Sequence, residues 1–454
     1  MIYWAPLLHF YQPPTQLHWV LRKVCNESYR PLVDLFTDLP YAKVTININA
    51  VLTEMLHDHG FDDVLVGLRE LANRGQVEFT GSGKYHPILP LIPTAEMERQ
   101  INHNYKANKR LLGKGYEPKG FFPPEMCYSR EILKPVVDAG HRWILISGVA
   151  CPTAWPMTVV HRIDVDGQKI AVLFRDNILS NKISFQSIDA RGFIAHLTQA
   201  HTARNGKGDI YVITAMDAET FGHHIQDWEK LILAEVYQSL SHEGADEHKA
   251  DDGTQLPLIP PSGPEQTSVL ARQHGKLLLS PEVIASEARQ IEAVTIGELV
   301  ERFPAGEVIE PRASSWSTEM PDINAGNPYP LWKDPNNVIH QYQWEHLSIA
   351  MAMVNKAFAE ARTDATRRYA DIARALLDAA MHSCQFWWAS KRPWWDINLI
   401  HKGLLEQHEV IMNAYKAISL SDCSVKEKKD YYYRVLAARD LFNKILDHIF
   451  TTPE

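Results

Sequence analysis

A change of pattern near residue 336 constrains the fold more than any other feature of this 454-residue chain. Before that point, short apolar segments rich in strand-forming residues alternate with segments of helical periodicity. Strands separated by helices favour parallel pairing through right-handed crossovers. Beyond it, apolar residues recur only at helical spacing, in segments 336–362, 364–390, 400–418 and 424–450. The sequence therefore predicts an α/β sheet or barrel followed by a helical region.

The expected strands and helices also set the domain boundaries. We expect strands over residues 2–8, 43–48, 76–80, 120–122, 142–147, 169–174 and 209–216. Segment 94–112 has acidic residues in its first turn and basic residues in its last, which suits the dipole of a helix. The domains that follow are a barrel over 1–310 with an irregular insertion near 241–275, a connection over 311–335 and a helical domain over 336–454.

Charge and cysteine usage exclude several classes of protein. Lys and Arg number 46 against 55 Asp and Glu, which gives a net charge of −9, and no basic block stands out. We therefore expect neither a nucleic-acid nor a membrane partner, because both rely on clustered positive charge. The N-terminal segment lacks the signal-peptide pattern, and the five cysteines are scattered without a CxxC pair. These features predict a cytoplasmic protein with reduced thiols and no structural metal.

Polar clusters follow several of the expected strands. They occupy residues 9–13, 78–87, 123–126 and 214–224. The carboxyl ends of parallel strands meet at one edge of a sheet, so Glu125 and Asp217 are expected to face one cleft. Paired carboxylates in a dry cleft suit acid/base and nucleophilic work at a glycosidic bond. The alternative is that such an Asp merely caps the next helix.

Four short motifs in this order resemble those of glycoside hydrolase family 57. They are His9–Pro13 (HFYQP), Gly75–Glu78 (GQVE), Pro123–Glu125 (PPE) and Asp217–His223 (DAETFGH). The resemblance implies an incomplete (β/α)7 barrel followed by a C-terminal helical domain. It also implies Glu125 as nucleophile and Asp217 as acid/base of a retaining double displacement.

The sequence departs from the family pattern in two places. Tyr11 stands where the family usually has a second His, and the segment nearest the fifth motif, His382–Trp388, lacks its Asp. A Tyr hydroxyl can still bond to a sugar hydroxyl. Subsite contacts are therefore where this chain is expected to differ from its relatives.

Further substrate contacts are predicted from strand ends and from the 12 tryptophans. Polar candidates are His9, Gln12, Glu78, His86, Asp176, Glu219 and His223. Aromatic candidates for stacking on pyranose rings are Trp143 and Trp388. The alternatives are satisfied structural polar groups and, for about half of the tryptophans, packing between barrel and helices.

The resemblance implies an enzyme that acts on α-glucan, with no cofactor and no metal. Within that class the compact length of the chain favours α-amylase-type hydrolysis of α-1,4-glucan or maltooligosaccharides. A 4-α-glucanotransferase or branching enzyme is the alternative within the same chemistry, because the step before the acceptor is shared. An α-galactosidase-like specificity also occurs in the family. A catalytically weak glycan-binding relative is the alternative from another class. The oligomeric state is left open.

Overall fold

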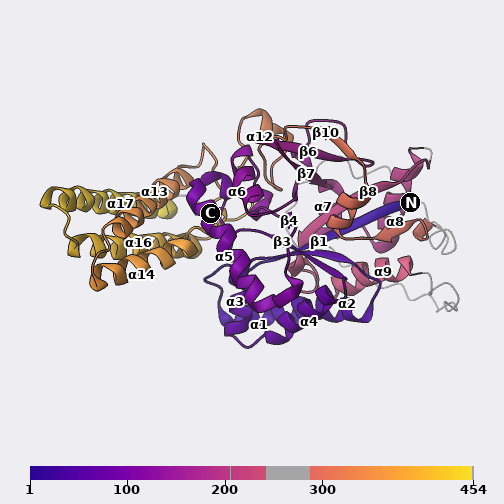
Figure 1. The fold of residues 1–454 in the computed structure, drawn as a ribbon, viewed down its shortest axis with the longest axis horizontal. Coiled ribbons are helices and arrows are strands. Elements are labelled where there is room, and N and C mark those ends of the chain that lie inside the picture. Colours follow the sequence, from indigo (N-terminus) through magenta and orange to yellow (C-terminus); the bar gives the residue numbers. More distant parts are fainter. Residues whose placement is uncertain (205, 242–286, 452–454) are drawn as a thin grey trace.

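The computed structural model describes residues 1–204, 206–241 and 287–451. The insertion expected near 241–275 lies outside the described residues, apart from Ser241. Figure 1 shows a sheet surrounded by helices, and a bundle of long helices that projects from one side of it. This division follows the change of pattern in the sequence.

Strands form one 10-stranded sheet in the described residues. Their bounds are β1 Ile2–Phe10, β2 Val44–Ile48, β3 Val77–Gly81, β4 Gly120–Phe121, β5 Trp143–Ser147, β6 Val160–Val165, β7 Gln168–Arg175, β8 Ile210–Asp217, β9 Ile291–Ala293 and β10 Ala305–Val308. The strand order is β10-β6-β7-β5-β4-β3-β2-β1-β8, and β9 pairs with β1. Every strand expected from the sequence is present, whereas the expectations missed β6, β9 and β10.

The parallel strands curl into an incomplete barrel. From β8 through β1, β2, β3, β4 and β5 to β7, all neighbours pair in parallel, and only β6 runs antiparallel to its neighbour β7. Strands β7 and β8, which begin and end this parallel run, are joined at their ends instead of by a ladder. The backbone N–H of Asp176 donates to the carbonyl of Ile213, and the Arg175 guanidinium donates to that of Ala215, both at 2.8 Å.

Helices cover the outside of the barrel and build the bundle (Figure 1). Those of the first part are α1 His18–Val24, α2 Arg30–Asp38, α3 Ala50–Asp58, α4 Asp62–Asn73, α5 Thr94–Leu112, α6 Leu133–Asp138, α7 Asn177–Ser184, α8 Ala190–Thr202, α9 Glu235–Leu240 and α11 Ile296–Arg302. Those that follow are α12 Met320–Asn324, α13 Val338–Ala359, α14 Asp364–Ala380, α15 Cys384–Trp387, α16 Ile397–Leu420 and α17 Val425–Thr451. None of the helices in these described stretches combines the length and hydrophobicity that a membrane crossing requires.

One expected helix is interrupted for a reason that matters to the site. Segment 364–390 was expected to be continuous, but α14 ends at Ala380 and the short α15 begins at Cys384. In the intervening turn the backbone N–H of Ser383 donates to the carbonyl of His86 at 3.0 Å, on the barrel side. This contact replaces an intrahelical hydrogen bond, so tertiary structure overrides the local periodicity.

Partly buried ion pairs hold the helical region against the barrel. Arg374 of α14 makes two hydrogen bonds of 2.8 Å to the carboxylate of Glu96 on α5. Arg99 of α5 pairs with Asp378 of α14, with Nη2 and Oδ2 2.6 Å apart. Bidentate Arg–carboxylate pairs fix orientation as well as proximity. The turn after α14 is thereby held at the mouth of the barrel.

Candidate active site

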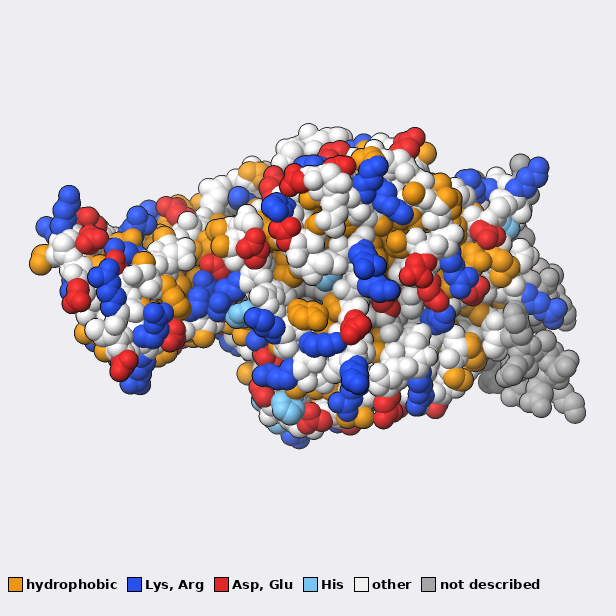
Figure 2. Space-filling view, viewed as in Figure 1, with side chains coloured by type: hydrophobic (Ala, Val, Ile, Leu, Met, Phe, Trp, Pro, Cys, Tyr) orange, Lys and Arg blue, Asp and Glu red, His pale blue; other side chains and the backbone are white. Residues whose placement is uncertain are grey.

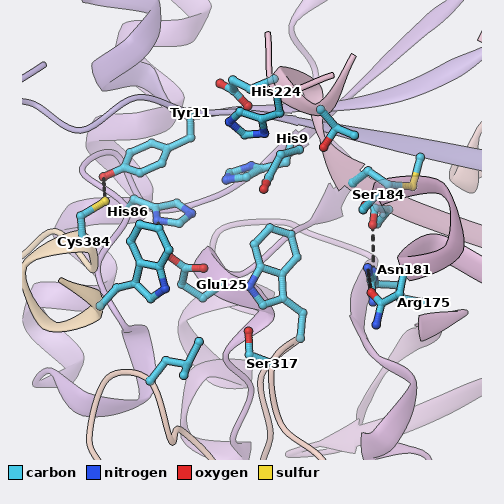
Figure 3. A pocket seen from close by; sticks show the side chains of 18 of the residues that line it. His9, Tyr11, His86, Glu125, Arg175, Asn181, Ser184, His224, Ser317 and Cys384 are labelled. Atoms are coloured by element: carbon cyan, nitrogen blue, oxygen red, sulfur yellow. Dashed lines mark hydrogen bonds and ion pairs between the residues drawn. The ribbon is translucent and has the colours of Figure 1, made fainter. Parts of the chain in front are cut away.

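A pocket of about 540 Å³ opens at the carboxyl ends of the parallel strands (Figure 3). Its lining from the barrel includes His9, Tyr11, Gln12, His86, Glu125, Arg175, Asp217 and Glu219. Its lining from the connection and the helical region includes Trp316, Trp332, Cys384, Trp387 and Pro393. The site is therefore built jointly by the barrel and the segments that follow it.

Glu125 follows β4 on a strained turn. Its backbone is left-handed at φ 57°, a conformation that a residue with a side chain adopts rarely. The Ser383 hydroxyl donates to its Oε1 at 2.8 Å, and His86 Nδ1 lies 3.5 Å from the same oxygen. The pKa of Glu125 is raised to about 8, chiefly by burial and also by the charge of Asp217, while the Ser383 hydrogen bond opposes the rise.

Asp217 is the last residue of β8 and lies beside His9 in the sheet register. Burial raises its pKa to about 6, and the positive charge of Arg175 opposes that rise. Arg175 is 5% exposed and donates to backbone and side-chain oxygens, including Asn181 Oδ1 at 2.9 Å. The guanidinium is thus a fixed cation beside the acid/base candidate.

A third carboxylate of the pocket, Glu219, lies two residues beyond Asp217. Gln12 donates to its Oε1 at 3.0 Å, and the Tyr29 hydroxyl donates to the same oxygen. Burial raises the pKa of Glu219 to about 7, and the charge of Asp217 adds to the effect. The two donors hold Glu219 in place at the pocket wall.

Three rings stack on the pocket floor beside Glu125 (Figure 3). The His86 ring centroid lies 4.9 Å from that of His9 and 4.0 Å from that of Tyr11. Burial lowers the pKa of His9 to about 4 and that of His86 well below its usual range, so both imidazoles are neutral at pH 7. Tyr11, which replaces the expected His, places its hydroxyl 3.5 Å from Cys384 Sγ.

Several predicted substrate contacts lie outside this pocket. Glu78 is near the start of β3, at the opposite end from the strand termini, and accepts from the Gly297 backbone at 2.8 Å. Trp143 is 2% exposed within the barrel, where its ring covers Gly120. Asp176 caps α7, accepting from Leu179 N at 2.9 Å.

His223 and Trp388 are likewise not among the lining residues. His223 Nδ1 lies 2.6 Å from a carboxylate oxygen of Glu27. Trp388 is 5% exposed and packs within the helical region against His382. In its place the preceding residue, Trp387, lines the pocket and stacks on Trp394 with ring centroids 5.2 Å apart.

The sequence reasoning missed Ser383, Trp316 and Trp332 as site residues. Trp316 and Trp332 lie in the connection, where no periodicity indicates which side chains turn inward. Ser383 lies within the altered fifth motif, and that resemblance was the signal that could have selected it. Within the described residues, no group of three or more His, Cys, Asp or Glu side chains is arranged to hold a metal ion.

Adjacent tryptophans therefore make a matched pair for testing. We expect Trp387→Ala to raise KM for the maltooligosaccharides expected from the sequence about tenfold, because an aromatic platform is lost, with little change in melting temperature. Trp388→Ala should instead lower stability by about 3–5 kcal/mol, because it empties a packed volume. Steady-state kinetics and thermal melts of both variants check this. Equal loss of binding and stability in Trp387→Ala would contradict it.

Paired buried carboxylates at the carboxyl edge of a parallel barrel are an arrangement suited to cleaving glycosidic bonds. The sequence model of glycosyl hydrolase family 57 matches residues 7–249 of this chain. The match covers more than half of the chain, and the chain belongs to this family. The resemblance noted in the sequence motifs is thereby confirmed.

Relatives with similar sequences are named alpha-amylase and 4-alpha-glucanotransferase. The chain is 27% identical over 190 residues to an alpha-amylase of Pyrococcus abyssi, which covers 40% of this chain and 28% of the amylase. It is 30% identical over 139 residues to a 4-alpha-glucanotransferase of Thermococcus litoralis, which covers 31% and 20% of the two chains. The match thus spans less than a third of the length of either relative.

The fold extends further than the sequence similarity. A branching enzyme of the same family from Thermococcus kodakaraensis superimposes with a TM-score of 0.64 at 14% identity, covering 100% of this chain and 97% of that one. At that identity the likeness concerns the fold alone. The expected incomplete (β/α)7 barrel with a helical region after it is confirmed.

Proposed function

We propose that this chain is a retaining enzyme that acts on α-1,4-glucan or maltooligosaccharides. The observation that carries the proposal is that Glu125 and Asp217, from two different strand ends, line one pocket. Burial raises the pKa of both carboxyls towards neutral pH. A pKa near the working pH suits a group that exchanges protons during the reaction. The alpha-amylase and 4-alpha-glucanotransferase relatives support glucan as the substrate class.

The reaction proceeds in two displacements. Ionised Glu125 attacks the anomeric carbon while Asp217 gives its proton to the glycosidic oxygen, so that the C–O bond breaks as the glycosyl ester forms. The released sugar keeps that proton. Asp217, now ionised, then removes a proton from the acceptor hydroxyl, whose oxygen displaces Glu125. Water as acceptor gives hydrolysis, and a sugar hydroxyl gives transfer.

Catalysis requires the carboxyl pair to hold one proton. At low pH both groups are protonated and the nucleophile is lost, whereas at high pH both are ionised and the acid is lost. The pair therefore predicts a bell-shaped kcat/KM profile with limbs near pH 6 and pH 8. Because Glu125 has the higher pKa, the reactive form, with Glu125 ionised and Asp217 protonated, is the less populated of the two singly protonated forms. The charge of Asp217 raises the pKa of Glu125, so the two titrations are coupled and the limbs belong to the pair and not to single residues.

Incubation with maltoheptaose, followed by chromatography of the products, tests the proposal. We expect shorter sugars alone, which correspond to hydrolysis. Longer and shorter sugars together would indicate a glucanotransferase, and altered iodine staining of amylose would indicate a branching enzyme. Binding of maltoheptaose without any change of chain length would contradict the proposal in favour of a glycan-binding relative.

A further inference from the structure

The turn between α14 and α15 contacts the floor of the pocket through consecutive residues. Ser383 Oγ lies 2.8 Å from Glu125 Oε1 and 2.9 Å from His86 Nδ1. The Ser383 backbone N–H also donates to the His86 carbonyl at 3.0 Å. The next residue, Cys384, contacts the Tyr11 hydroxyl. A segment of the helical region thus meets the predicted nucleophile directly.

The direction of these hydrogen bonds follows from the chemistry of the groups. In the reactive form Glu125 is ionised and can only accept, so the single Ser383 proton then points to Oε1. Ser383 Oγ must then accept from His86, which assigns the imidazole proton to Nδ1. Both the Ser383 and the His86 side chains are almost fully buried, at 0% and 1% exposed. The relay His86 → Ser383 → Glu125 therefore has one self-consistent direction when Glu125 is ionised.

The geometry points to Ser383 as the positioning residue of the nucleophile, an inference that rests on the proposed function. Its hydroxyl holds Oε1 and leaves Oε2 as the oxygen that meets the anomeric carbon. His86 is neutral, so the relay orients Glu125 without a facing cation that would pair with it and reduce its nucleophilicity. The altered fifth motif, which lacks the family's Asp, thus supplies a hydroxyl donor to the catalytic carboxylate.

The position of Ser383 depends on how the helical region is attached to the barrel. The relay depends on the turn after α14, and the Arg374–Glu96 and Arg99–Asp378 pairs fix α14 to α5. An error of about 1 Å in the placement of a catalytic group can cost about 100-fold in rate. The ion pairs therefore act on the nucleophile through the position of Ser383.

Ser383→Ala is expected to lower kcat about 10- to 100-fold with little change in KM, because a hydrogen bond to a charged group is lost. The Glu125 pKa should rise, which moves the alkaline limb of the pH profile to higher pH. The other titratable groups around Glu125 are His86, Asp217, Tyr11, Cys127 and Cys384. The rate loss should also appear with α-maltosyl fluoride, whose leaving group needs no proton.

Ser421→Ala is the matched control, because the Ser421 hydroxyl is buried and donates to the Ile418 carbonyl at 2.7 Å, at the end of α16. It should reproduce any stability loss without the change of kcat or pH profile, and Ser383→Thr should restore the rate.

Infrared titration of the Glu125 carboxyl measures its pKa without turnover, in any variant that keeps its fold. Glu125→Gln, which lacks this carboxyl, supplies the blank. An unchanged Glu125 pKa and unchanged kcat in Ser383→Ala would overturn the inference alone. A wild-type chain inactive on both donors would overturn the proposed function and the inference with it.

Discussion

Glu125→Gln is expected to lower turnover of maltooligosaccharides by at least about 10⁴-fold, because an amide cannot form the glycosyl ester. The replacement keeps the shape of the side chain and the acceptor for Ser383. Substrate binding should therefore survive, and direct calorimetric titration with maltoheptaose checks that it does. A variant that keeps more than a few per cent of wild-type turnover would remove Glu125 from the nucleophile role.

The same substitution should change stability in a pH-dependent way. The folded-state pKa of Glu125 is raised from 4.5 to about 8, so its contribution to stability is fully present below pH 4.5 and declines as pH rises through 8. Glutamine has no charge to bury. Glu125→Gln should consequently melt at a higher temperature than the wild type at pH 8, with the difference shrinking towards pH 5.

Chemical rescue separates the nucleophile from a residue that merely shapes the pocket. With Glu125→Ala and α-maltosyl fluoride, added azide should fill the vacated space and attack the anomeric carbon directly, giving the β-azide. An α-azide would mean that another group had formed the covalent intermediate. Product configuration by proton NMR distinguishes the two.

The structure places in one pocket most of the residues expected from the ends of the strands. Glu125, Asp217, His9 and His86 belong to different clusters of the sequence, and they meet because parallel strands end at one edge. That part of the site follows from strand order and needs no side-chain detail. Their catalytic and binding roles stay predictions until the variants are measured.

Two predicted site residues, Glu78 on β3 and Trp143 on β5, lie within strands and do not line the pocket. Glu78 was selected from a motif, but it lies near the amino end of β3 and its carboxylate accepts from Gly297 beneath the barrel. Trp143 alternates into the barrel interior and fills the space that Gly120 leaves. A motif match fixes which strand a residue is on, while position along the strand decides whether it reaches the cleft.

The contribution of the helical region was the least predictable part. Helical periodicity runs through residues 364–390, and nothing local marks the turn at Ser383 that breaks it. Likewise, Trp387 and Trp388 are adjacent and chemically equivalent, yet only Trp387 lines the pocket. Which of two neighbouring side chains faces the site depends on the docking of α15 on the barrel, which is a tertiary property.

The net charge of −9 gave no indication of a polyanionic partner, and the visible surface agrees. Positive and negative side chains are intermixed over the face in Figure 2 instead of forming a field of one sign. A neutral glucan chain needs no such field, because ring stacking and hydroxyl hydrogen bonds recognise it.

Asp217→Asn is expected to show a loss that depends on the leaving group. Turnover of maltoheptaose should fall about 10³–10⁴-fold, because the leaving oxygen is no longer protonated. Cleavage of α-maltosyl fluoride should fall far less, because fluoride leaves unprotonated. Pre-steady-state release of fluoride, compared with sugar release from maltoheptaose, gives both numbers. Equal losses on the two donors would contradict an acid/base role.

The coupling of the two carboxyls provides a second, independent test of the same variant. The charge of Asp217 raises the pKa of Glu125, so removing that charge should bring the Glu125 pKa below about 8. With the fluoride donor the alkaline limb should vanish as well, since no acid remains to be lost. Ser383→Ala moves the Glu125 pKa in the opposite direction, because it removes a donor instead of an anion. Opposite shifts in the two variants would identify Glu125 as the group that both of them act upon, whereas a shift of the same sign would separate Ser383 from the nucleophile.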